Sequence, residues 1–181
     1  MLPRKKDFGQ EVRCFGSEHR RREWLAVRVL LRALSDEEKE ISYHADGRPY
    51  LTDASAAISI SHTKGYVALV LGPQGREIGI DIEQYAEKVR RVARKFMRED
   101  EGLSWFRGTD LWSLLLHWSA KETVFKCLNA SEVDFRCHIR ILPFLVEQEG
   151  VFSAEEYRTP ERRWFTIRYL LCNDFVLTMS L

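Results

Sequence analysis

Two acidic side chains in the segment Gly79-Ile80-Asp81-Ile82-Glu83 are the first candidates for chemistry. Successive side chains of a β-strand point to opposite faces, so in a strand Asp81 and Glu83 would share one face, with both isoleucines toward a core. Two anions one strand repeat apart repel each other unless a cation or a hydrogen-bond donor lies between them. Such a pair suits Mg²⁺, which takes one or two protein carboxylates and leaves its other positions to water and phosphate. The alternative is a strand with one solvated acidic face.

The segment 118–126, W-S-A-K-E-T-V-F-K, is the second candidate. Its structural interpretation is a helix start, because Ser119 and Glu122 form a capping-box pattern and Glu122 and Lys126 form a favourable i,i+4 pair. Its functional interpretation is that Glu122 completes a three-carboxylate metal site. Lys126, one turn further along the same face, would then contact a phosphate held by that metal. Lys121 is about 100° away around the helix and need not share that ligand.

Two further polar sites lie earlier in the chain. Arg28 borders the apolar stripe of a helix predicted over 17–34, which begins at the N-cap Ser17. It is either an arginine whose stem covers the core or an anion clamp at the edge of a cleft. Ser61 and His62 end a predicted strand and offer a hydroxyl and an imidazole near a turn, although a lone histidine is often a structural residue.

Alternating helical and strand segments must position these residues. The apolar patterns predict helices over 17–34, 87–98 and 119–129, a hairpin over 58–71, a strand over 78–83, strand-like pieces over 137–146 and a closing hairpin over 164–181. The strands between residues 58 and 83 follow one another closely, which favours an antiparallel meander. The order of helix then strands, repeated twice, is typical of two α+β halves packed together.

Composition excludes several classes of protein. The chain has 181 residues, with 28 basic and 27 acidic side chains, so its bulk charge predicts neither a nucleic-acid nor a membrane partner. Its apolar runs are far shorter than the roughly 20 residues that span a bilayer. Cys14, Cys127, Cys137 and Cys172 have no zinc-type spacing. We therefore expect reduced thiols and a soluble cytoplasmic protein.

The candidate clusters, taken in order with three other blocks, resemble a known family. G-I-D-I-E at 79–83 and W-S-A-K-E-x-x-x-K at 118–126 resemble the paired signatures of the 4′-phosphopantetheinyl transferases. W-L-A-V-R-V-L-L at 24–31, G-R-P-Y at 47–50 and I-S-I-S-H at 58–62 are similar to blocks of the single-chain, surfactin-synthetase-activating type. The resemblance runs from about residue 18 to the C-terminal strands, although the chain is short at its N-terminus compared with many of that type.

The resemblance implies an α+β fold of two similar halves packed as a pseudo-dimer, with antiparallel sheets and helices. The halves would cover residues 1–83 and 84–181, with the site between them, and the chain would be a monomer. The implied reaction moves 4′-phosphopantetheine from coenzyme A to a serine of an acyl or peptidyl carrier protein and releases adenosine 3′,5′-bisphosphate. Mg²⁺ would be the metal, with Mn²⁺ as an alternative. Whether the carrier serves fatty-acid, polyketide or nonribosomal-peptide synthesis stays open.

The resemblance also implies roles for individual residues. The metal ligands would be Asp81, Glu83 and Glu122, the catalytic residues Glu122 and Lys126, and the residues around the coenzyme A phosphates Arg28, Arg48, Ser61, His62, Lys121 and Lys126. Glu122 is also the candidate base for the carrier serine, a role that competes with metal ligation because a metal-bound carboxylate is a poorer base. Carrier proteins are typically acidic, so the basic face of the helix predicted over 87–98 is a candidate docking surface.

Three other hypotheses remain. A non-catalytic relative would bind coenzyme A or a carrier protein without transferring anything. A Mg²⁺-dependent phosphohydrolase would use the same carboxylates on a nucleotide and would release phosphate from coenzyme A without a carrier. A plain structural or interaction domain would show no Mg²⁺-dependent ligand binding.

Overall fold

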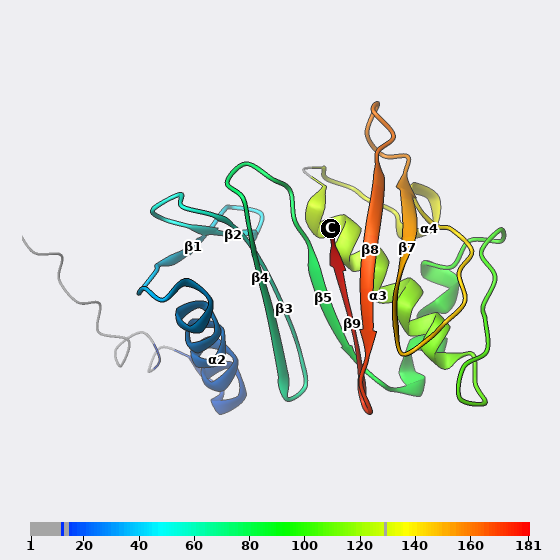
Figure 1. The fold of residues 1–181 in the computed structure, drawn as a ribbon, viewed down its shortest axis with the longest axis horizontal. Coiled ribbons are helices and arrows are strands. Elements are labelled where there is room, and N and C mark those ends of the chain that lie inside the picture. Colours follow the sequence, from blue (N-terminus) through cyan, green and yellow to red (C-terminus); the bar gives the residue numbers. More distant parts are fainter. Residues whose placement is uncertain (1–11, 13–14, 129) are drawn as a thin grey trace, which may run out of the picture.

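The structure, a computed structural model, describes residue 12, residues 15–128 and residues 130–181 (Figure 1). Its helices are α2 (Glu18–Ser35), the 3₁₀ helix η1 (Glu87–Lys95), α3 (Leu111–Cys127) and α4 (Phe135–His138). Its strands are β1 (Ile41–Tyr43), β2 (Pro49–Leu51), β3 (Ala57–Thr63), β4 (Tyr66–Gly72), β5 (Ile80–Gln84), β6 (Ile139–Ile141), β7 (Glu149–Glu156), β8 (Trp164–Leu171) and β9 (Phe175–Ser180). All the sheet pairings among the described strands are antiparallel, which confirms the predicted α+β class.

The N-terminal part forms as the local sequence signals predict. Ser17 caps α2, because its hydroxyl accepts a hydrogen bond from the backbone N–H of Arg20 at 3.3 Å. The buried face of α2, which includes Val27 and Leu31, packs against the β3–β4 hairpin (Figure 1). The short strands β1 and β2 pair with each other beside this hairpin and complete a small apolar core.

The C-terminal part is a five-stranded sheet in the order β5-β9-β8-β7-β6, with α3 packed across it (Figure 1). The predicted meander through residue 83 is wrong in its last strand, because β5 pairs with β9 rather than with β4. In this register Asp81 lies opposite Thr178. The β3–β4 hairpin instead packs beside β5, and Ala68, Ile80 and Ile82 form a third apolar cluster there.

Helix α3 begins at Leu111, so the prediction that the helix starts at residue 119 is wrong. The capping-box interpretation is wrong for the same reason, because Ser119 lies in the middle of the helix. Its hydroxyl is fully buried and shares a hydrogen bond of 2.8 Å with the hydroxyl of Thr178 on β9. The motif residues of segment 118–126 therefore belong to the last three turns of a long, largely buried helix.

Other elements also differ from the prediction. The helix predicted over 87–98 is a 3₁₀ helix that ends at residue 95. Of the strand-like region 137–146, only β6 is a strand, whereas β7 occupies residues that showed no clear strand pattern. The closing hairpin is confirmed as β8 and β9.

The main core lies between α3 and the five-stranded sheet. It contains aliphatic residues of the helix and the inward-facing residues of β6 to β9, including Leu115, Ile141, Ile167 and Leu171. No helix in the described part of the chain is long and apolar enough to cross a membrane. Cys127, Cys137 and Cys172 are free thiols, and Cys14 lies outside the described residues.

Candidate active site

The acidic strand β5 presents its carboxylates to α3, as the alternation predicted. Asp81 is 4% exposed, and its Oδ1 accepts hydrogen bonds from the hydroxyl of Ser61 and the ammonium of Lys126, both at 2.8 Å. Lys126 also donates to the backbone carbonyl of Ile80 at 2.8 Å. The other oxygen, Oδ2 of Asp81, is buried without a hydrogen-bond partner, which is costly for a carboxylate. The site therefore holds an acceptor available to a further donor or a cation.

Glu83 lies one strand repeat further along β5 and contacts the same helix. Its Oε1 accepts a hydrogen bond of 2.8 Å from the indole N–H of Trp118. Burial raises the pKa of Glu83, the Trp118 hydrogen bond opposes this, and the negative charge of Asp81 adds to the increase. Glu83 is thus held by α3 in a site that disfavours its charge.

Glu122 completes the acidic group from the helix side. Burial, together with the neighbouring carboxylates of Asp81 and Glu83, raises the pKa of Glu122 to about 7, although Lys126 opposes the increase. The charges of Asp81 and Glu83 therefore both act on Glu122, and the nearby ammonium only partly offsets their effect. This is a group of anions that a divalent cation would stabilise.

The three carboxylates fit a metal ion in charge and ligand type. Among the described residues, no three carboxylate, imidazole or thiol side chains lie close enough together to hold one as they stand. The buried Oδ2 of Asp81, hard oxygen ligands and the excess of negative charge nevertheless match the requirements of Mg²⁺.

A groove of about 710 Å³ is lined by Lys126, the partner of Asp81, although none of the three carboxylates lines it. Residues of the turn before β2, strand β3, the loop before β5 and the end of α3 line it, among them Arg48, Tyr50, Ser59, Arg76, Phe125 and Lys126. Arg48 contacts Asp46 of the same turn, with its Nε 2.7 Å from a carboxylate oxygen. Lys126 therefore lies between this groove and the acidic strand, and the groove is also lined by two arginines, Arg48 and Arg76.

The other expected phosphate contacts lie in different places. His62, 57% exposed, points toward α2, where its Nδ1 lies 3.2 Å from the carboxylate of Glu23. Arg28 places its guanidinium 3.3 Å from the ring centroid of Trp24 and donates to the carbonyl of that residue. Ser61 is part of the acidic site through its bond to Asp81. The structure thus brings together Ser61, the three carboxylates and Lys126, with Arg48 across the groove.

The structure does not support a phosphate contact for Lys121. Its side chain is fully buried, and its ammonium donates to the carboxylate of Glu101 at 2.8 Å and to the carbonyls of Phe96 and Phe135 at 2.6 and 3.2 Å. Three donors with three protein acceptors leave none for a ligand. The prediction failed because Glu101 lies in a loop whose contact with α3 no local pattern indicates.

Sequence reasoning also missed two supporting groups. Trp118 stands in the recognised motif, but nothing in its spacing shows which carboxylate its indole contacts. The hydroxyls of Ser119, Thr123 and Thr178 form a buried cluster under the acidic strand, with oxygen separations of 2.8 and 2.7 Å. The Thr178 contacts link segments more than fifty residues apart, so no local signal could have found them.

Gly79 allows strand β5 to approach α3 closely. A Cβ at this position would lie 2.2 Å from the carbonyl oxygen of Thr123 and 2.9 Å from Sγ of Cys127. We expect Gly79→Ala to lower the free energy of unfolding by about 3 kcal/mol, because backbone or helix must move. Urea denaturation measures this. Gly102→Ala, where a Cβ would meet nothing within 4 Å, is the matched control, and equal losses in both variants would contradict this explanation.

The raised pKa of Glu122 predicts a pH-dependent stability. A carboxyl whose pKa is about 7 in the folded state and 4.5 in its ordinary state favours folding most below pH 4.5, and this contribution is lost as the pH rises through 7. Relative to Glu122→Gln, the metal-free protein should lose about 3 kcal/mol of stability between pH 4.5 and pH 8. Urea denaturation in EDTA across this range measures the difference, and a difference independent of pH would contradict the prediction.

Comparison with known proteins places this site in a family. The family model described as the 4′-phosphopantetheinyl transferase superfamily matches residues 77–180, more than half of the chain. The chain belongs to this superfamily. The match covers β5 and α3, which carry the three carboxylates and Lys126.

A curated relative agrees with this assignment. A protein of Haemophilus influenzae, provisionally assigned as a 4′-phosphopantetheinyl transferase, is 29% identical over 125 residues. The matched region is 66% of this chain and 51% of the relative, so the chain spans about half the length of that protein.

Proposed function

We propose that this protein transfers the 4′-phosphopantetheine group from coenzyme A to a serine of an acyl or peptidyl carrier protein, with Mg²⁺, and releases adenosine 3′,5′-bisphosphate. Membership of the superfamily supports the reaction class. The observation that carries the proposal is the buried Asp81, which binds Lys126 through one oxygen and has the other unpartnered, beside Glu83 and Glu122. Cleavage of a pyrophosphate bond is catalysed mainly by positioning the reactants and neutralising charge, and this site can supply both.

The groove residues bind and orient the donor in this proposal. Lys126, at the junction of groove and acidic strand, would stabilise the phosphate under attack, because a fixed cation acts where negative charge develops. Arg48 offers a bidentate guanidinium to a phosphate on the other side of the groove. Arg28 and His62 remain proposed phosphate contacts although neither lines the groove, whereas Lys121 is not part of the proposal.

The carboxylates would hold Mg²⁺, with Asp81 as the central ligand and Glu83 and Glu122 beside it. When bound, Mg²⁺ would offset the charge of the pyrophosphate. Ser61 donates to Oδ1 of Asp81 and thereby helps to fix this carboxylate. Glu122, whose pKa is raised to about 7 in the metal-free site, would accept the proton of the carrier serine only while it does not ligate Mg²⁺, because a metal-bound carboxylate is a poorer base.

The finer assignments are also proposals. We infer a monomer of the single-chain type, with one half over residues 1–83 and the other over 84–181. Support comes from the site itself, since Ser61 lies on the β3–β4 hairpin of the first half and Glu122 and Lys126 lie on α3 of the second, while Asp81 lies on β5, which joins the sheet of the C-terminal part. The strand β5 pairs with β9 across this boundary, so the halves would share one site.

The release of adenosine 3′,5′-bisphosphate from coenzyme A tests the proposal against its rivals. We expect release with Mg²⁺ and an apo carrier protein, and none without the carrier or with EDTA. Phosphate release without a carrier would identify a phosphohydrolase. Mg²⁺-dependent coenzyme A binding without release, with several unrelated carriers, would identify a non-catalytic binder.

The exposed arginines of η1 are the proposed docking surface for an acidic carrier. Arg91 and Arg94 point to solvent, whereas Arg90 pairs with Glu87 and Asp110. Reversing the charge of both exposed arginines, Arg91→Glu with Arg94→Glu, should raise the KM for the carrier about tenfold and leave coenzyme A binding unchanged. Steady-state kinetics and calorimetry measure the two effects.

A matched control uses an exposed arginine on another element. Arg168→Glu on β8 changes charge on the sheet and should leave the KM for the carrier near the wild-type value. Equal effects of the η1 variant on carrier and coenzyme A would contradict the docking proposal.

A further inference from the structure

The indole of Trp118 connects α3 to the acidic strand. Trp118 lies one turn before Glu122, and its Nε1–H donates to Oε1 of Glu83 at 2.8 Å. The indole N–H is part-buried and therefore needs an acceptor, and a carboxylate acceptor makes the bond charge-assisted and directional. The bond therefore sets where one oxygen of Glu83 lies.

Two phenylalanine rings hold the indole in place. The ring of Phe96, which is fully buried, lies 5.1 Å from that of Trp118 with an interplanar angle of 58°. The centroid of the Phe135 ring lies 5.6 Å from that of Trp118, with an interplanar angle of 45°. Both distances are within the range of favourable tilted aromatic contacts. Both rings therefore favour the orientation in which the indole reaches Glu83.

The ammonium of Lys121 joins the backbones of these same two phenylalanines. It donates to the carbonyls of Phe96 and Phe135 and to Glu101, and it lies three residues after Trp118 on the same helix. Residues three apart on a helix are neighbours on its surface, so one face of α3 carries both the indole and the ammonium.

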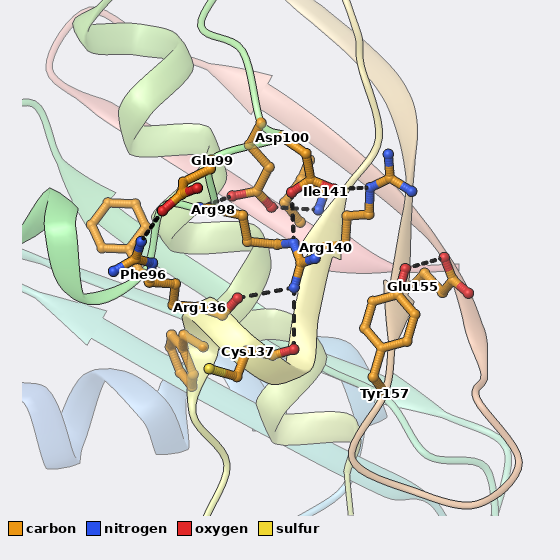
Figure 2. Close-up of polar contacts among 12 residues, drawn as sticks. Phe96, Arg98, Glu99, Asp100, Arg136, Cys137, Arg140, Ile141, Glu155 and Tyr157 are labelled. Atoms are coloured by element: carbon orange, nitrogen blue, oxygen red, sulfur yellow. Dashed lines mark hydrogen bonds and ion pairs between the residues drawn. The ribbon is translucent and has the colours of Figure 1, made fainter.

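The loop that carries Phe96 is fixed at further points. The carboxylate of Glu101 accepts from the backbone N–H groups of Arg98 and Ile141 at 2.9 and 2.7 Å. Figure 2 shows Arg98 reaching the carbonyls of Arg136 and Cys137. The segment around Phe96 is therefore held to α3, α4 and β6 at once.

We propose that Trp118 is a positioning residue of the transferase, which fixes the Glu83 carboxylate beside the other two, and that the buried Lys121–Glu101 pair fixes the rings that hold it. This inference deepens the proposed function and rests on it for its kinetic consequence. It accounts for the tryptophan and the lysine of the motif by their contacts within the protein. The alternative is that Trp118 only fills the core.

The spectroscopic test uses ¹⁵N-labelled, metal-free protein and follows the indole N–H resonances. Trp118→Phe identifies the Trp118 resonance by its loss. Glu83→Gln should shift that resonance, because the amide replaces a charged acceptor, while Glu149→Gln, at an exposed glutamate of β7, should not. An unmoved Trp118 resonance in Glu83→Gln would overturn the inference, and this result does not depend on any enzyme activity.

A double-mutant cycle supplies the kinetic test. We expect Trp118→Phe to lower kcat/KM for transfer about tenfold, as removal of a supporting partner of a metal ligand does. The double variant Trp118→Phe/Glu83→Gln should lose no more than Glu83→Gln alone, because one residue acts through the other. Trp164→Phe, at an exposed indole, is the control that should keep wild-type kinetics.

The outcomes separate this inference from the function on which it rests. Wild-type protein that transfers nothing to any carrier would contradict the proposed function. Active wild-type protein with multiplicative losses in the double variant would overturn the positioning role and leave the function standing. Non-additive losses with a shifted indole resonance would support both.

Discussion

Asp81→Asn is expected to abolish phosphopantetheine transfer without unfolding the protein. Asparagine keeps the shape of the side chain and an oxygen for the donors of Ser61 and Lys126, but it removes the anion on which the acidic site is centred. With that oxygen kept toward Ser61 and Lys126, an NH2 group stands in place of the unpartnered Oδ2. An NH2 group cannot ligate a cation as a carboxylate oxygen does. We expect the rate of transfer to fall at least about a thousandfold, the upper range for losing one electrostatic contact at a reacting centre.

Carrier-dependent release of adenosine 3′,5′-bisphosphate measures this loss, and circular dichroism checks the fold. Asp110→Asn is the matched control, because it removes a carboxylate at the opposite end of α3, where Asp110 pairs with Arg90. That variant should transfer near the wild-type rate. Folded Asp81→Asn protein with a rate within about tenfold of wild type would contradict the central role of this carboxylate.

Lys121→Met is expected to be the most destabilising single change in the motif. The side chains of Lys121 and Glu101 are both fully buried in the pair, so losing the ammonium leaves an uncompensated carboxylate and two carbonyls without their donor. Breaking a buried pair by removing one partner costs about 3–5 kcal/mol. Urea denaturation at neutral pH measures the loss.

The double variant Lys121→Met/Glu101→Gln keeps the test informative if the single variant does not fold. The N–H groups of Arg98 and Ile141 donate to different oxygens of Glu101, so the single amide oxygen of the glutamine can keep only one of these bonds. Because the glutamine carries no buried charge, part of the stability should still return. Lys126→Met provides the contrast, since it should lose transfer with a much smaller loss of stability. A stable Lys121→Met protein that binds coenzyme A more weakly would instead restore the phosphate-binding role.

Local sequence signals predicted the elements that local forces determine. Helix α2 follows from the Ser17 cap and an apolar stripe, and the β3–β4 and β8–β9 hairpins follow from short turns between β-rich runs. Tertiary contacts decided the rest. Strand β7 was missed because its inward-facing residues include the fully buried Glu156, which accepts hydrogen bonds from the following loop.

The candidate site divides in the same way. Alternation along β5 placed Asp81 and Glu83 on one face, and helical spacing put Glu122 and Lys126 one turn apart. That the strand and the helix meet was expected from the family resemblance and not from either spacing. The role of Lys121 could not be predicted, because its partner Glu101 lies twenty residues away in a loop without regular structure. The contact between Trp118 and Glu83 likewise depends on the approach of two elements rather than on spacing within one.

Intact mass spectrometry of an apo acyl carrier protein incubated with this protein, coenzyme A and Mg²⁺ tests the central claim most directly. The account predicts that the carrier gains the mass of one phosphopantetheinyl group. The gain should disappear with EDTA and with the Asp81→Ala and Glu122→Ala variants. An unchanged carrier mass across several unrelated apo carriers, with folded protein and saturating coenzyme A, would contradict the account.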